Sequence, residues 1–192
     1  MVTLFTTHIR PLLDYCSTVW CVGYVDDLNL LESVQRRWTK QVVGMSELDY
    51  GARLRALDLF SIRGRFLRSD LIKYWKILCS DSEGYDLSVM FQRSLLEHAR
   101  GHRHRLLMPI CATDIRKKFF NVRNIMLWNS LPSVVVDSAT LSGFKGSLAA
   151  FLGDALYDFL LQYCVLCGAC CSCFGIEPCP APSLGFGPGV GG

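Results

Sequence analysis

Apolar residues recur at helical spacing over most of the first 153 positions of this chain. From position 28 onward they return every three or four residues, while polar side chains fill the positions between them. This is the pattern of an amphipathic helix with one buried face. It predicts a helix that begins behind Asp26 and Asp27 and ends before Gly44. The apolar stripe expected to face the core consists of Leu28, Leu31, Val34, Trp38 and Val42.

Two further helices are predicted in the middle of the chain. A short one covers residues 47–57, where apolar and cationic side chains alternate at helical spacing. A longer one runs to about Cys79 from Ser61, whose hydroxyl is well suited to cap a helix N-terminus. The core stripe of the longer helix consists of Leu67, Leu71, Tyr74, Trp75 and Leu78.

Two more helices are predicted toward the end of the regular part. Asn121 is the expected cap of the first, which must stop before Pro132 because proline disfavours helical conformation in the residue ahead of it. The second covers residues 141–152, with Ser138 or Thr140 as its cap.

The fold class follows from the kind of periodicity present. No segment shows the period-two alternation of a half-buried strand, and residues 80–118 contain turns and a Pro-interrupted connector. With 51% hydrophobic residues, the chain can bury a core of ordinary size. The predicted fold is all-α, an irregular helical bundle over residues 1–153. Residues 154–192 are Cys-rich and then Gly- and Pro-rich, and this tail is expected to be disordered.

Positive charge is confined to the predicted bundle. All 20 Lys and Arg residues lie at or before Lys145, and the whole chain carries a net charge of +3. Cations on the helices either contact phosphates or form solvated faces, and the pattern fits both interpretations equally. The run at 100–105 is denser than ordinary surface patterning, which favours binding. The candidate nucleic-acid-binding residues are Arg36, Arg37, Lys40, Arg65, Lys73, Lys76, Arg100, His102, Arg103, His104, Arg105, Arg116, Lys117 and Lys118.

The tail raises the question of a metal site. Six of the ten cysteines lie at positions 164–179, with part of the spacing of an iron–sulfur loop. The expected fourth ligand position holds Phe174, and no histidine follows at zinc-finger spacing. The weak metal candidates are Cys164, Cys167, Cys170 and Cys173. We predict no bound cofactor.

Two features bear on location. The first residues lack a basic segment followed by an apolar core, so no secretory signal is recognised and an intracellular location, nucleus or cytoplasm, is expected. The apolar stretch at 159–176 is marginal in length for a membrane span and contains Gln162. We therefore do not expect a membrane partner, and reversible acylation of the tail cysteines is a weak alternative.

Six sequence blocks within about residues 3–152 carry a family resemblance. The blocks are IRPLLDYCSTVW, LESVQRRWTK, YGARLRALDLFSIRGRFLRSDLIKYWKIL, RGHRHRL, RKKFFNVRNIMLWNSLP and FKGSL. In their order and rough spacing they resemble jockey-like non-LTR retrotransposon polyproteins. In that family these blocks lie downstream of the reverse-transcriptase palm, in the thumb and the helical region that follows it. The resemblance implies a surface that contacts RNA or an RNA/DNA primer–template, without a small-molecule substrate.

Residues 24–27 spell YVDD, the tetrad that holds catalytic carboxylates in a reverse-transcriptase palm. In the family that tetrad lies well upstream of the RPLLDYCSTVW block, whereas here it follows the block. A palm also needs a third carboxylate on an earlier strand, and only 23 residues precede Tyr24. We therefore expect no catalysis. Asp26 or Asp27 is instead expected to cap the next helix and to favour the positive end of its dipole.

Two hypotheses for the function remain. The first is a non-catalytic fragment of a retrotransposon RNA-directed DNA polymerase that contacts the nucleic-acid backbone without sequence specificity. The second is a structural or interaction relic of a truncated mobile element, in which the helices pack but the charges have no ligand.

Overall fold

The computed structural model describes residues 2–21, 24–79, 90–94 and 101–157 of the chain. Within these ranges the chain is helical and forms no strand beyond one antiparallel bridge between Arg93 and Leu106. This confirms the predicted all-α class. The Cys-, Gly- and Pro-rich tail lies outside the described residues. Among the helices in the described ranges, none combines the length and the apolar character needed to cross a membrane.

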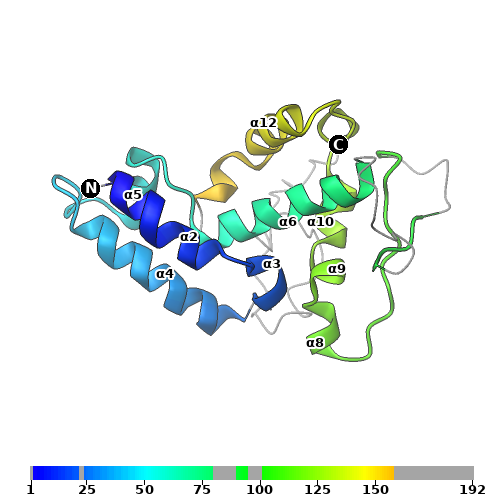
Figure 1. Ribbon diagram of the computed structural model, residues 1–192, viewed down its shortest axis with the longest axis horizontal. Helices are drawn as coiled ribbons and strands as arrows, with labels where there is room; N and C mark the ends of the chain where they lie inside the picture. Colours follow the sequence, from blue (N-terminus) through cyan, green and yellow to red (C-terminus); the bar gives the residue numbers. More distant parts are fainter. Residues whose placement is uncertain (1, 22–23, 80–89, 95–100, 158–192) are drawn as a thin grey trace, which may run out of the picture.

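The helices vary widely in length, and α6 is the longest (Figure 1). The first half of the chain contains α1 (Val2–Leu4), the π-helical η1 (Phe5–Ile9), α2 (Arg10–Asp14), α3 (Ser17–Trp20), α4 (Val25–Lys40), α5 (Tyr50–Ala56) and α6 (Ile62–Cys79). The second half contains α8 (Asp114–Lys117), α9 (Phe120–Arg123), α10 (Ile125–Ser130), α11 (Ser133–Val136), α12 (Leu141–Leu152) and the 3₁₀ turn η2 (Gly153–Leu156).

Helix α6 crosses the middle of the molecule and packs against elements from both halves of the chain (Figure 1). Its predicted cap is confirmed, because the Ser61 hydroxyl accepts a hydrogen bond from the Gly64 amide at 3.0 Å. The Ser61 amide and hydroxyl also donate to the Leu156 carbonyl oxygen, at 2.9 and 3.1 Å. The start of α6 is thereby tied to η2, and the packed region continues past residue 153 to the buried Leu156.

The C-terminal half of α6 lies in a large apolar cluster, which we call the aromatic core. All five residues of the predicted stripe are buried, as expected. Trp75 stacks on Phe144 of α12 with ring centroids 5.5 Å apart, and Tyr74 lies 5.7 Å from Trp128 of α10. Because aromatic rings bury large areas, these contacts hold α6, α10 and α12 together. The buried aromatic members are Tyr74, Trp75, Phe91, Trp128 and Phe144.

Helix α4 turns a different face inward from the one predicted. Its buried residues are Leu28, Glu32, Gln35 and Thr39, whereas Val34 of the expected stripe is 44% exposed. Leu31, Trp38 and Val42 are only partly buried. The sequence-based expectation was therefore confirmed for Leu28 and wrong for Val34. Leu31 packs against the apolar cluster that contains Leu28, and Trp38 stacks on the buried ring of Phe5 with the ring centroids 4.1 Å apart.

Hydrogen bonds explain the inward face of α4. Glu32 accepts one from the Tyr50 hydroxyl and one from the Ile62 amide, the latter at 2.8 Å. Gln35 donates to the Phe60 carbonyl oxygen at 3.0 Å. These side chains bind the backbone at the entry to α6, so polar pairing sets the orientation of α4. We call Glu32, Gln35, Thr39, Tyr50 and Arg53 the polar network.

The role predicted for the YVDD aspartates is corrected in part. Tyr24 is the N-cap residue of α4, and its side chain makes no capping hydrogen bond within the described part of the chain. Asp26 and Asp27 lie two and three positions further along the chain, exposed in the first turn. They therefore do not cap α4, but their position still favours the positive end of the helix dipole.

The predicted cap at Asn121 is also wrong. Phe119 is the N-cap residue of α9, and Asn121 lies inside that short helix. Its side-chain amide instead donates to the Met90 carbonyl oxygen at 3.0 Å. The predicted stop before Pro132 is confirmed, since α10 ends at Ser130.

The last long helix agrees with its prediction. Helix α12 covers the expected residues, and the Thr140 hydroxyl accepts a hydrogen bond from the Gly143 amide at 3.1 Å. Between the two expected caps, the structure therefore selects Thr140. Gly153 follows with a φ of +45°, a conformation that favours glycine over other residues.

Candidate nucleic-acid interface

The basic connector at 101–106 packs against α10 and is not a free cationic strand. The His102 ring nitrogen Nε2 donates to the Trp128 carbonyl oxygen at 2.9 Å, and the Trp128 indole donates to the His104 carbonyl oxygen at 2.8 Å. Asn129 bonds both the amide and the carbonyl of Leu106, at 2.9 and 2.8 Å. Residues 102–106 therefore pack against Trp128 and Asn129 of α10.

This contact corrects the prediction for His102. Its side chain is buried, its ring meets that of Trp128 edge-on, and burial lowers its pKa. A buried neutral imidazole does not contact a phosphate outside. Burial likewise lowers the pKa of the half-buried His104. The density of basic letters in this run reflects packing as well as surface charge.

The arginines of the same run have different positions. Arg103 is exposed and forms an ion pair with Asp137 at 3.6 Å, while Arg105 is partly buried. Such an exposed pair is weak, so Arg103 remains accessible to a phosphate. Arg100 lies outside the described residues.

The α4 cations, Arg36, Arg37 and Lys40, are exposed, as a surface role requires. Arg36 lies over the Tyr50 ring, with its guanidinium carbon 4.9 Å from the ring centroid. This contact is a cation–π interaction between α4 and α5.

The cations around α8 already have partners within the chain. Lys117 pairs with Asp114 at 2.9 Å, and the Lys118 ammonium lies 3.6 Å from the centroid of the Tyr24 ring. Arg116 is exposed and lies over the Phe119 ring. These three cations are spread over separate local contacts and do not converge on one point.

A second set of cations does converge, in a cavity of about 360 Å³ along α6 that we call the cationic groove. Lys73 and Lys76 of α6 are exposed at the groove, and Lys145 of α12 is partly buried there. Among the residues that the structure describes, Asp14 is the only acidic one that lines the groove. The charged residues that line the groove are Arg10, Asp14, Arg65, Arg68, Lys73, Lys76 and Lys145.

Arg65 was predicted as a surface phosphate contact, but only 7% of the residue is exposed. The reason is that α3 packs against α6 and Asp14 of α2 forms an ion pair with the Arg65 guanidinium. Arg65 therefore does not lie on an open helix face. It still lines the groove, at its inner side.

Burial and mutual repulsion set the electrostatics of the groove. Burial and, to a lesser extent, the charge of Arg10 together lower the pKa of Arg65 to about 9. The same two causes, in the same order, lower the pKa of Arg68. These arginines stay protonated at neutral pH, yet each is held in a less favourable environment than water. An anion in the groove would relieve that cost.

Three groove cations escaped the sequence-based prediction: Arg10, Arg68 and Lys145. Arg10 and Lys145 are isolated cations in otherwise uncharged surroundings, far from α6 along the chain. Arg68 follows Arg65 at a spacing of three, which places both on neighbouring positions of one helix face. Of the three missed cations, Arg68 is therefore the one for which the sequence held a signal.

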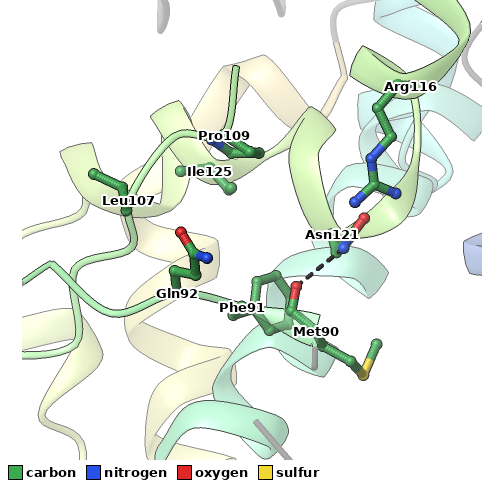
Figure 2. A pocket seen from close by; sticks show the side chains of 8 residues that line it. All are labelled: Met90, Phe91, Gln92, Leu107, Pro109, Arg116, Asn121 and Ile125. Carbon is green, nitrogen blue, oxygen red and sulfur yellow. Dashed lines mark hydrogen bonds between the residues drawn. The ribbon is translucent and has the colours of Figure 1, made fainter. Parts of the chain in front are cut away.

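A smaller cavity of about 140 Å³ lies between the 90–94 segment and α8 to α10 (Figure 2). Phe91 and Ile125 line it together with the polar side chains of Gln92 and Asn121. Figure 2 shows the Asn121 side chain bonded to the backbone of Met90, which closes one side of the cavity. Within the described part of the chain, Arg116 is the only cation that lines this cavity, so the cavity carries much less positive charge than the cationic groove.

Metal-binding side chains do not gather in the described part of the chain, where no three His, Cys, Asp or Glu residues are placed to hold an ion. The four weak cysteine candidates of the tail lie outside the described residues. The free cysteines that are described, Cys16, Cys21, Cys79 and Cys111, are separate from one another in the sequence and form no disulfide.

Comparison with models of protein families, with curated proteins and with solved structures finds no match for this chain. The resemblance to retrotransposon polyproteins therefore stays a prediction.

Proposed function

We propose that this chain binds the sugar–phosphate backbone of nucleic acid without sequence specificity, through the cationic groove. It acts as a binding module and carries out no polymerase chemistry. RNA or an RNA/DNA primer–template is the ligand that the sequence resemblance implies.

One observation carries the proposal: six cationic side chains and a single carboxylate line the same concave surface. A cleft lined by charges of one sign concentrates the field and raises the local concentration of polyanions. Lys and Arg bind phosphate oxygens, which carry no base identity, so the groove supports affinity without sequence readout.

The test compares a groove variant with a matched control. In the groove variant, Lys73→Ala and Lys145→Ala remove two lining cations. In the control, Arg55→Ala and Arg93→Ala remove two cations that lie outside the groove. Both variants lose the same net charge. Binding to a fluorescent RNA/DNA duplex with 5′-hydroxyl ends is followed by anisotropy at several salt concentrations.

The groove variant is expected to bind roughly tenfold more weakly. The slope of the logarithm of the binding constant against the logarithm of salt concentration should become shallower by about two, because binding with two fewer phosphate contacts releases fewer counterions. The control is expected to bind nearly as the natural chain does. Equal weakening in both variants would show that net charge, and not the groove, drives binding. No complex at low salt would favour the structural relic.

A second variant, Arg103→Ala with Arg105→Ala, tests the connector. Because Arg103 already interacts with Asp137, its loss is expected to weaken binding less than loss of the groove lysines. If the connector variant bound the duplex more weakly than the groove variant does, the main interface would lie at the connector.

A further inference from the structure

Three arginines line the cationic groove, and the charge of Arg10 acts on the other two. We call Arg10, Arg65 and Arg68 the arginine triad. They come from two elements, with Arg10 at the start of α2 and the other two one turn apart on α6. All three line the groove. Asp14 is the one acidic residue that lines it with them, and it pairs with Arg65.

The triad has more hydrogen-bonding capacity than the described chain satisfies. The Arg65 nitrogen Nη1 and the Arg68 nitrogen Nε are buried and have no hydrogen-bond partner among the described residues. Arg65 itself is 93% buried, as its 7% exposure shows. Buried guanidinium donors without partners are costly, so an anion that accepts hydrogen bonds from them would be stabilised at this position.

The charges agree with the geometry. The charge of Arg10 lowers the pKa of both Arg65 and Arg68, although burial is the larger cause in each case. Burial lowers the pKa of Arg10, and the negative charge of Asp58 opposes that shift. Asp58 does not line the groove. The three guanidinium groups of the triad and the carboxylate of Asp14 together carry an excess of two positive charges.

We propose that the arginine triad is a binding site for a phosphate monoester, a dianionic group such as the terminal phosphate of a nucleic-acid strand or of a free nucleotide. This inference rests on the proposed function and names the part of the ligand that reaches the inner side of the groove. The two sources share one chemistry, and the experiment separates them.

The site suits a terminal phosphate better than an internal one. A terminal phosphate carries two negative charges and presents three oxygens, which match the fork geometry of guanidinium donors. An internal phosphodiester carries one charge and has sugars on both sides, which keep it at the rim. The groove volume of about 360 Å³ is roughly ten times the share of one water molecule, so a phosphate with its sugar fits.

The first experiment measures binding of inorganic phosphate by isothermal titration calorimetry and by thermal shift, at constant ionic strength set with chloride. Arg68→Gln removes one triad member that is only partly buried, and Arg93→Gln is the matched control outside the groove. Phosphate also stabilises proteins because it is excluded from the protein surface, and comparison with the control variant separates that general effect from binding.

Arg68→Gln is expected to weaken phosphate binding by roughly tenfold, because a charge-assisted hydrogen bond is lost, whereas Arg93→Gln should leave it unchanged. Asp14→Asn is a second variant, and it is expected to strengthen phosphate binding. It removes the carboxylate that competes for Arg65, so phosphate should raise its Tm by more than it raises that of the natural chain. Because each variant is compared with its own ligand-free Tm, partial destabilisation does not obscure the result.

The second experiment separates the two sources of the phosphate. The same oligonucleotide is compared with a 5′-phosphate and with a 5′-hydroxyl, alongside a nucleoside 5′-monophosphate as competitor. A terminal-phosphate site predicts roughly tenfold tighter binding of the phosphorylated strand, and loss of that preference in Arg68→Gln. Competition by the monophosphate alone, without a strand preference, would assign the site to free nucleotides.

Failure of this inference is distinguishable from failure of the proposed function. If the 5′-hydroxyl duplex binds in a salt-dependent way but phosphorylation and inorganic phosphate have no triad-dependent effect, backbone binding stands and the terminal-phosphate site is overturned. If phosphate binds with triad dependence but no duplex binds, the groove is an anion site unrelated to nucleic-acid strands, and the proposed function is overturned.

Discussion

The two ends of α6 are held in different ways, by the aromatic core at one end and by the polar network at the other. In the aromatic core, the packing of Trp75 on Phe144 and of Tyr74 beside Trp128 joins helices from distant parts of the chain. In the polar network, the buried carboxylate of Glu32 accepts hydrogen bonds from Tyr50 and from the α6 backbone.

The two regions differ in how narrowly each restricts the arrangement of the helices. Apolar contacts are tolerant of direction, because similar shapes pack nearly as well in several arrangements. A buried carboxylate tolerates only arrangements that satisfy its oxygens, since an unpaired buried charge is very costly. The aromatic core therefore contributes stability with little directional preference. The polar network, beside the apolar cluster of Leu28, Ile62 and Phe66, favours one orientation of α4 on α6.

The largest expected effect tests the aromatic core. Trp128→Ala should lower the free energy of unfolding by roughly 3–5 kcal/mol, because the side chain is fully buried and its indole bonds the His104 carbonyl oxygen. Urea denaturation followed by circular dichroism measures the change. A loss below about 1 kcal/mol would show that the core contributes little to stability.

A matched pair of hydroxyl deletions compares the two regions directly. Tyr50→Phe removes the donor to the Glu32 carboxylate, and Tyr74→Phe removes a donor to the Phe120 carbonyl oxygen at 2.7 Å. Hydrogen bonds to charged groups contribute about 1.5–3 kcal/mol and neutral ones about 0.5–1.5 kcal/mol. Tyr50→Phe should therefore cost more in urea denaturation. The reverse order would show that Glu32 is not charged in the folded chain.

The polar network also predicts a pH dependence. Burial raises the pKa of Glu32 above its ordinary value of 4.5, despite the opposing hydrogen bonds. Between the two pKa values the folded chain keeps a proton that the unfolded chain has released, so stability should fall as pH rises through and above 4.5.

Glu32→Gln should flatten that fall, which urea midpoints from pH 4 upward would measure. Burial raises the pKa of Asp70 as well, so the difference in slope between the natural chain and Glu32→Gln isolates Glu32. Equal slopes would contradict the assignment.

The smallest expected effect concerns the entrance of α4. Replacing both Asp26 and Asp27 with Asn should lower stability by only about 0.3–1 kcal/mol, because exposed first-turn carboxylates act through the helix dipole. Duplex binding should be nearly unchanged. Thermal melts at low and high salt check that the helix dipole is the cause. The difference in Tm between the natural chain and the double variant should shrink as salt screens the dipole.

The success of sequence-based prediction followed the chemistry of each region. The α6 stripe and the caps at Ser61 and Thr140 were predicted correctly, because apolar periodicity and short polar caps act locally. The orientation of α4 was not, because Glu32 gains partners that come from α5 and from the entry to α6. No periodicity of α4 alone encodes those partners.

The same limit applied to the candidate site. Lys73 and Lys76 were found because they lie on an exposed helix face, and they do line the groove. Arg10 and Lys145 were missed because only the fold brings them to α6. His102 was misassigned for a related reason, since its sequence neighbours are cationic but its spatial neighbour is Trp128.

The tie between Ser61 and Leu156 has a consequence for the timing of recognition. Because η2 fixes one end of α6 and the aromatic core fixes the other, the cations on this helix keep their spacing before any ligand arrives. A preorganised surface loses little conformational entropy on association. Encounter should then be a single bimolecular step whose rate rises linearly with ligand concentration, slows with added salt and shows no slower rearrangement afterwards.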